Sequence, residues 1–148
     1  MPLQIIDVNK PDGTLVAQEW LFRTDFVHRQ LRPQMDMDHV NQMLRVFAGG
    51  GRMVVAVEDE AVVGLAVYRI YENTFEGRQL YVDDLVSEQS QRSTGIGKAL
   101  MDHLMQIAKD EKCIGFNLDS GVQRAQAHKF YFREGMVVSA FHFWKGVK

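Results

Sequence analysis

The stretch Arg92-Ser93-Thr94-Gly95-Ile96-Gly97-Lys98 is the part of this sequence best suited to chemistry, because two glycines precede a run with helical spacing. Glycine lets the backbone approach a ligand closely, and the first N–H groups of a helix have no partners inside it. The helix dipole favours an anion there, and Arg92 and Lys98 add positive charge on either side. The stretch therefore predicts a binding site for a phosphate or pyrophosphate.

Two familiar phosphate motifs match this stretch only in part. A P-loop has four residues between its glycines and a Ser or Thr after its Lys, whereas one residue separates Gly95 from Gly97 and Ala99 follows Lys98. A dinucleotide fingerprint needs a third glycine, where this chain has Leu100, although Asp119 supplies the acidic residue that the motif places further along. We therefore exclude the P-loop and keep a dinucleotide-binding module as the weaker alternative.

The stretch lies at the centre of a predicted strand–helix–strand unit. Residues 80–120 read as an apolar strand, a polar loop, a helix over Gly95 to Lys112 and a second strand over Cys113 to Leu118. Along the helix, Ile96, Leu100 and Leu104 form an apolar stripe. This unit would carry the glycine turn at the mouth of its helix.

The remaining elements are predicted from hydrophobic spacing and from breaker residues. Glycine at position 64 marks a bulge. The predicted elements outside the central unit are a strand Leu3 to Val8, a helix Leu15 to Leu31, a helix from Asp38 to Gly49, a hairpin of Met53 to Val57 with Ala61 to Ile70, a helix Gly121 to Arg133 and a strand Met136 to Trp144. The order β-α-α-β-β-β-α-β-α-β is a mixed α/β class with a mostly antiparallel sheet, and residues 1–148 suit a single domain.

Two segments of the chain resemble one known family. Arg92-Ser93-Thr94-Gly95-Ile96-Gly97 resembles the acyl-CoA pyrophosphate loop of the GNAT superfamily of N-acetyltransferases. Downstream, residues 127–136, Ala-His-Lys-Phe-Tyr-Phe-Arg-Glu-Gly-Met, look like that family's A-x-x-F-Y-x-x-x-G-F/M segment. The two occur in the family's order, and the resemblance covers essentially the whole chain. It implies the GNAT fold and an enzyme that transfers an acetyl group from acetyl-CoA to an amine.

The resemblance also implies how acetyl-CoA would bind. Its pyrophosphate would lie on the loop's N–H groups, and its pantetheine arm would pair with the strand before the loop as an added strand does. A backbone N–H of that strand would polarise the thioester carbonyl. The residues implied are Leu85 and Val86 on the strand and Arg92, Thr94, Gly95, Ile96, Gly97 and Lys98 in the loop.

The catalytic residues implied are an acid and a base. Tyr131 matches the tyrosine that protonates the departing CoA thiolate in the family, although a core aromatic at this position is the alternative. Asp83 matches a family glutamate that deprotonates the acceptor ammonium, and its shorter side chain favours action through water. Because Asp83 and Asp84 are adjacent on a strand, we expect them to point to opposite faces. The alternative is that both are solvated or pair with Arg69 or Arg78.

The acceptor is left open by the sequence. Asp36, Asp38 and Glu72 lie where the resemblance places the acceptor site, and they would attract a cationic amine, either a small molecule or a lysine or N-terminal amine of a protein. A protein that binds acyl-CoA as a sensor and transfers nothing is the alternative. Homodimers occur in the family, so a homodimer is also kept open.

Composition excludes several other classes. The chain has 148 residues, a net charge of -2, and 46% hydrophobic residues, which predicts a globular protein without a nucleic-acid partner. No apolar run is long enough for a membrane span and the first residues do not resemble a signal peptide, so we expect a cytoplasmic protein. The histidines show no metal-ligand spacing, and no metal is expected.

Overall fold

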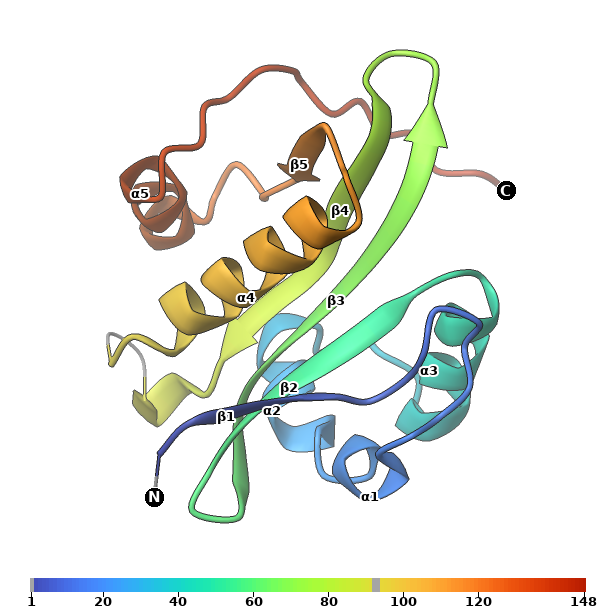
Figure 1. Ribbon diagram of the computed structural model, residues 1–148, viewed down its shortest axis with the longest axis vertical. Helices are drawn as coiled ribbons and strands as arrows, with labels where there is room; N and C mark the ends of the chain where they lie inside the picture. Colours follow the sequence, from blue (N-terminus) through green and yellow to red (C-terminus); the bar gives the residue numbers. More distant parts are fainter. Residues whose placement is uncertain (1, 92–93) are drawn as a thin grey trace. The chain divides into compact units, whose positions relative to one another are not determined.

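The computed structural model describes residues 2–91 and 94–148, and the chain divides into two compact units, Met1–Asn117 and Leu118–Lys148. We describe each unit by itself. The first unit contains, in order, β1 (Gln4–Asp7), α1 (Gln18–Leu21), α2 (Asp25–Leu31), α3 (His39–Ala48), β2 (Arg52–Glu58), β3 (Ala61–Asn73), β4 (Gly77–Ser87), a 3₁₀ turn η1 (Gln89–Gln91), α4 (Ile96–Asp110) and β5 (Gly115–Leu118), whose last residue begins the second unit (Figure 1).

The strands form one five-stranded sheet in the order β1-β2-β3-β4-β5. The pairs β1–β2, β2–β3 and β3–β4 are antiparallel. Since α4 connects β4 to its neighbour β5, the predicted strand–helix–strand unit is confirmed. A doubly wound dinucleotide fold needs a mostly parallel sheet, so this topology does not support the dinucleotide alternative.

Two of the strand pairs contain one extra residue. Between β2 and β3, Ala56 faces Gly64 and Val57 faces Val62, so Val63 is the extra residue, directly beside the glycine where the sequence predicts a bulge. Between β3 and β4, Val67 faces Asp84 and Tyr68 faces Val82, which makes Asp83 the extra residue. A bulge interrupts the alternation of side chains between the two faces of a sheet.

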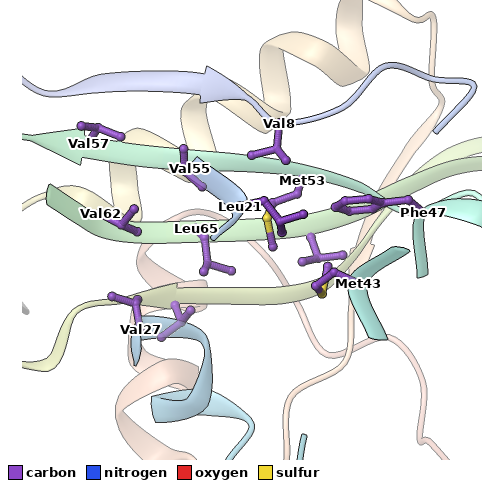
Figure 2. Close-up of a cluster of buried hydrophobic side chains, with 12 residues drawn as sticks. Val8, Leu21, Val27, Met43, Phe47, Met53, Val55, Val57, Val62 and Leu65 are labelled. Atoms are coloured by element: carbon purple, nitrogen blue, oxygen red, sulfur yellow. The ribbon is translucent and has the colours of Figure 1, made fainter. Parts of the chain in front are cut away.

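The sheet is covered on both faces. Side chains alternate along β3, so that Leu65 and Val67 face α1–α3 while Gly64 and Ala66 face α4. Figure 2 shows the first layer, in which Leu65 and Val55 from the sheet belong to the same buried cluster as Met43 and Phe47 from α3. On the second face, α4 lies along β3 and β4 (Figure 1). This double burial explains why residues 62–68 are all buried.

The helix predicted over Leu15 to Leu31 is wrong as one element, because the chain forms two short helices there, α1 and α2. The break lies at Thr24, which is fully buried and whose hydroxyl donates to the carbonyl of Leu21 at 2.8 Å. Threonine side chains that bond to a backbone carbonyl three residues earlier compete with continued helix. The helix predicted from Asp38 is confirmed, since the Asp38 carboxylate accepts from the Asn41 N–H at the start of α3.

The second unit contains the helix α5 (Ala125–Arg133), which confirms the last predicted helix with a later start. The strand predicted over Met136 to Trp144 is wrong, because residues 136–148 form no strand in the described chain. Phe141 and Trp144 are 84% and 82% exposed there. Apolar, β-branched and aromatic residues favour strands mainly through packing on neighbouring strands, and a segment without such packing does not express that preference.

Candidate active site

The glycine turn lies where the sequence predicts it, at the start of α4. Gly95 has φ +91°, a left-handed conformation that suits glycine, and its carbonyl accepts the first helical hydrogen bond from the Ala99 N–H at 3.0 Å. The N–H groups of Ile96 and Gly97 therefore belong to the first turn, where a helix binds anions. Thr94 and Gly95 are exposed beside them.

Arg92 and Lys98 are the two cations expected to flank this turn, and the structure describes only the second. Arg92 lies outside the described residues. The ammonium of Lys98 lies 3.4 Å from the carboxylate of Asp102, one turn further along α4. Lys98 thus contributes to the turn through its backbone position, while its side chain contacts a residue on the helix surface.

Gly64 fixes where α4 begins relative to the sheet. A Cβ at this position would lie 2.7 Å from Cγ2 of Ile96, 3.1 Å from the carbonyl oxygen of Val86 and 3.2 Å from Cδ1 of Leu100. Only a residue without a side chain permits such a close approach. The absence of a side chain at Gly64 thus lets the first turn of α4 lie close to the strand that carries Leu85 and Val86.

The edge of β4 near Leu85 and Val86 is the predicted pantetheine site. The β5 side makes its contacts at the beginning of β4, where the Ile114 N–H donates to the Arg78 carbonyl at 2.7 Å and Asn117 donates to Gln79 at 2.6 Å. With about 3.3 Å per residue, the single residue of β5 beyond Asn117 does not reach Val86. β4 and β5 therefore pair only at the beginning of β4, which leaves Leu85 and Val86 beyond the reach of β5.

A cavity of about 260 Å³ opens on the other side of β4, beside α2 and α3. Its walls combine charged, amide and apolar side chains: His28, Arg32, Gln34, Met35, Gln42, Met43, Val46, Val67, Arg69, Asp83 and Asp84. The expectation that Asp83 and Asp84 point to opposite faces is wrong, because both line this cavity. The physical reason is the extra residue at Asp83, which interrupts the alternation of β4.

Asp83 is a half-buried carboxylate with one oxygen engaged. Nε and Nη2 of Arg69 each lie 2.9 Å from its Oδ2, and Oδ1 has no hydrogen bond to the described residues. Burial raises the pKa of Asp83 above its ordinary value, against the opposing effect of Arg69. A carboxylate that is costly to keep charged and has a free oxygen in a cavity is suited to accept a proton.

Asp84 is more buried and fully engaged. Its Oδ2 accepts from Nε2 of His28 at 2.8 Å, and its Oδ1 accepts from Nε of Arg32 at 2.8 Å. Burial acts to raise the pKa of Asp84, but the hydrogen bond from His28 and the charge of Arg32 outweigh it and hold that pKa below its usual value. The two adjacent aspartates therefore differ: Asp84 stays ionised and Asp83 is poised to exchange a proton.

Behind Asp84 lies a chain of two buried histidines. Nδ1 of His28 is 3.2 Å from Nε2 of His39, and the two residues are 1% and 4% exposed. Because a carboxylate only accepts, Nε2 of His28 carries the hydrogen. With His28 neutral, its Nδ1 accepts from Nε2–H of His39, and Nδ1 of His39 is then a buried lone pair without a partner among the described residues. Burial lowers the pKa of His39, which favours the neutral form of His39.

Sequence reasoning overlooked these histidines because it searched for metal spacing. The signal present in the sequence is the pair His28 and Arg32, four residues apart at the end of α2, with both side chains reaching Asp84. Of the three acidic residues expected to attract a cationic acceptor, Asp36 and Asp38 are engaged elsewhere, and Glu72 is exposed on β3. Asp36 pairs with Arg45 at 2.7 Å, and Asp38 caps α3.

Tyr131 lies on α5 in the second unit, half-buried, with its ring 5.5 Å from the ring of Phe130 in an edge-on arrangement. In the same unit, Nδ1 of His142 lies 3.0 Å from the Asp119 carboxylate. The assignment of Tyr131 as the acid stays a prediction.

Two absences concern the described part of the chain alone. Residues 2–91 and 94–148 contain no group of three or more His, Cys, Asp or Glu side chains placed to hold a metal ion. Within the same ranges, every helix is too short or too polar to cross a bilayer.

A mixed sheet flanked by helices, opened beside the glycine turn of α4, defines the class of acyl-CoA-dependent acetyltransferases. The chain belongs to the Acetyltransferase (GNAT) family, whose model matches residues 15–136. It is 29% identical over 134 residues to an uncharacterized N-acetyltransferase, YhdJ, of Bacillus subtilis, which covers 80% of this chain and 85% of that protein. The predicted family, fold class and enzyme class are thereby confirmed.

Solved structures share the fold. The aminoglycoside N-acetyltransferase AAC(6')-Iy in complex with CoA has a TM-score of 0.80 at 16% identity, covering 98% of this chain and 95% of that one. An acetyltransferase of Trypanosoma brucei has a TM-score of 0.75 at 20% identity, covering 99% and 100%. At these identities the likeness concerns the fold alone.

Proposed function

We propose that this acetyltransferase moves an acetyl group from acetyl-CoA to a primary amine by direct attack within a ternary complex. The observation that carries the proposal is the placement of two aspartates in one cavity on β4, with Asp83 biased toward protonation and Asp84 held ionised. The same strand carries Leu85 and Val86 toward the turn of α4. Donor and acceptor would therefore meet on a single strand.

On the donor side, the pyrophosphate is proposed to lie on the turn formed by Thr94, Gly95, Ile96, Gly97 and Lys98, with Arg92 beside it. The pantetheine arm would pair with the backbone of Leu85 and Val86, which β5 leaves uncovered. When bound, the thioester supplies an activated acetyl group. A backbone N–H of this strand segment would donate to its carbonyl oxygen as negative charge develops there.

On the acceptor side, Asp83 is proposed as the general base. The ammonium gives a proton to Oδ1 of Asp83, directly or through one water, and the free amine attacks the thioester carbonyl. A C–N bond forms, the C–S bond breaks, and the thiolate takes a proton from the Tyr131 hydroxyl. The Tyr131 phenolate then takes the second proton of the attacking nitrogen, and Asp83 releases its proton to water. The raised pKa of Asp83 assists the first transfer, because it narrows the gap to the pKa of an amine.

Residues 1–148 are proposed to act as one acetyltransferase domain, supported by the family match over residues 15–136. A small-molecule amine and a protein amine both remain candidates at this level, as does a homodimer. AAC(6')-Iy has been solved with CoA-S-monomethyl-acetylneamine, which supports a CoA donor and an amine acceptor for this chain.

The test is a thermal melt with acetyl-CoA, CoA, NAD and ATP, followed by acetyl transfer to a panel of amines. A ligand at about 100 times its Kd adds about 2.7 kcal/mol, which for a domain of this size raises Tm by roughly 5–10 °C. We expect shifts with acetyl-CoA and CoA alone, abolished in Gly97→Trp. A shift with NAD alone would refute the donor site, and binding without transfer to any amine would identify an acyl-CoA sensor.

A further inference from the structure

The guanidinium of Arg32 is held on one edge only. Its Nε and Nη2 lie 2.8 and 2.7 Å from Oδ1 of Asp84, and Nη2 donates to the Asp83 carbonyl at 3.0 Å. Nη1 has no hydrogen bond to the described residues, and the side chain lines the cavity with 37% exposure. An arginine fixed along one edge presents its remaining N–H groups in a defined direction, which suits recognition of a carboxylate or phosphate.

The support behind Arg32 is buried, so its orientation is set before a ligand arrives. Asp84 is 14% exposed and is gripped from the opposite side by His28, which is itself hydrogen-bonded to His39. Swinging Arg32 away would leave the Asp84 carboxylate with His28 alone, and an uncompensated buried charge is costly. Guanidinium, carboxylate and two imidazoles thus form a chain from α3 through α2 to the cavity wall.

The charges of the cavity are balanced. Asp83, ionised as a base must be, pairs with Arg69, and Asp84 pairs with Arg32, so these two ion pairs contribute two negative and two positive groups to the walls. A polycationic acceptor would need unpaired carboxylates, which this wall does not supply. An acceptor with one amine and one anionic group would keep the balance, with the amine at Oδ1 of Asp83 and the anion at Arg32. A cavity of about 260 Å³ is of a size that can hold a small molecule or a side chain.

We propose that the acceptor carries a carboxylate near its amine, as an amino acid does, and that Arg32 binds this carboxylate while Asp84, His28 and His39 position the guanidinium. The proposal rests on the proposed function, since it assumes that the cavity receives the amine. It assigns Arg32 to selecting the acceptor and Asp83 to deprotonating it.

The experiment compares acceptors with and without the carboxylate: β-alanine with propylamine, in which a methyl group replaces it, and L-lysine with cadaverine, in which hydrogen replaces it. For the wild type we expect kcat/KM at least about 10-fold higher for the carboxylated member of each pair, the effect of one charge-assisted contact. In Arg32→Gln the ratio of kcat/KM values within each pair should fall to about 1–3, mainly because KM for the carboxylated acceptor rises. Arg32→Lys keeps the charge but loses the planar fork, and should give an intermediate ratio. Arg45→Gln, on an exposed arginine paired with Asp36, is the matched control and should keep the wild-type ratio.

Two further measurements distinguish failure of this proposal from failure of the proposed function. His28→Gln keeps a donor near Asp84 and should retain more of the ratio than His28→Leu, whereas a purely structural histidine would change both members of each pair equally. Binding of β-alanine and propylamine to the CoA complex is measured by calorimetry as well, so the comparison stands without turnover. Three results would overturn the proposal. They are a wild type that uses propylamine and cadaverine as well as or better than the carboxylated acceptors, an unchanged kcat/KM ratio in Arg32→Gln, and an Arg32→Gln variant that no longer shows the acetyl-CoA thermal shift. A wild type without an acetyl-CoA shift would instead refute the proposed function.

Discussion

Substitution of Gly64 by alanine should disturb the proposed donor site. Gly64 itself lies on β3, but a side chain there would push against the first turn of α4, which is proposed to bind the donor. The new Cβ would lie 2.7 Å from Cγ2 of Ile96, where ordinary carbon contacts are about 3.5–4.0 Å. The first turn of α4 would therefore have to move by about 1 Å or Ile96 would have to change rotamer. Overpacking of this kind costs about 1–3 kcal/mol, which corresponds to a Tm lower by roughly 2–12 °C.

The effect on function follows from the same movement. Loss of one charge-assisted contact to the pyrophosphate would raise the Kd for acetyl-CoA by about 10-fold. Thermal melts and calorimetric titration of acetyl-CoA measure the two effects. The double variant Gly64→Ala/Ile96→Ala removes the clashing methyl, so its stability loss should be smaller than the sum of the single losses by about 0.5–3 kcal/mol.

Gly49→Ala is the matched control, because a Cβ there meets nothing closer than 3.6 Å and the backbone φ of -88° is ordinary. It should leave stability and acetyl-CoA affinity near the wild-type values. If Gly64→Ala also leaves both unchanged, or if the two single losses simply add, then the close approach of β3 and α4 does not position the donor site.

Three other predictions concern the proton-transfer groups. Asp83→Asn should lower kcat by about 100-fold or more. It should not lower Tm at pH 8, because the raised pKa of Asp83 means that the folded state disfavours the charged carboxylate. A marked loss of stability would contradict this. Asp84→Asn should cost about 1–3 kcal/mol at pH 7. The lowered pKa of Asp84 stabilises the fold above the ordinary carboxyl pKa, and this stabilisation is lost as the pH falls through the folded-state value, so the deficit measured by denaturant titration should shrink toward pH 3. A deficit that is constant with pH would argue for a packing effect. Tyr131→Phe should reduce turnover strongly while the Kd for acetyl-CoA is kept, and unchanged turnover would make Tyr131 a packing residue.

The features that could be predicted from the sequence are those that depend on local signals. Gly95 and Gly97 indicate the mouth of α4, Asp38 indicates the start of α3, and the polar turn between Val57 and Ala61 indicates the hairpin. Each follows from the chemistry of a few neighbouring residues. The family resemblance rests on residues 92–97 and 127–136 and on their order along the chain, and the family match over residues 15–136 confirms it.

The features that could not be predicted depend on contacts distant in sequence. The grouping of His28 with Asp84 joins residues 56 positions apart, and the extra residue at Asp83 shows only when β3 lies beside it. The expected strand near Trp144 failed for a related reason, since an apolar pattern indicates a strand only where a neighbouring strand is present. Spacing along one segment contains none of this information.

The extra residue at Asp83 also has a consequence for how this scaffold diversifies. In a regular strand, inserting or deleting a residue inverts every side chain beyond it, which would turn the core of β4 outward. Here the irregularity is already confined to one position, with Val82 and Asp84 each in register with β3. Deleting Asp83 would therefore remove one carboxylate from the cavity while the residues on either side keep their partners. A single-codon deletion at this point would thus make the β3–β4 pairing regular without inverting Leu85 and Val86 further along the strand.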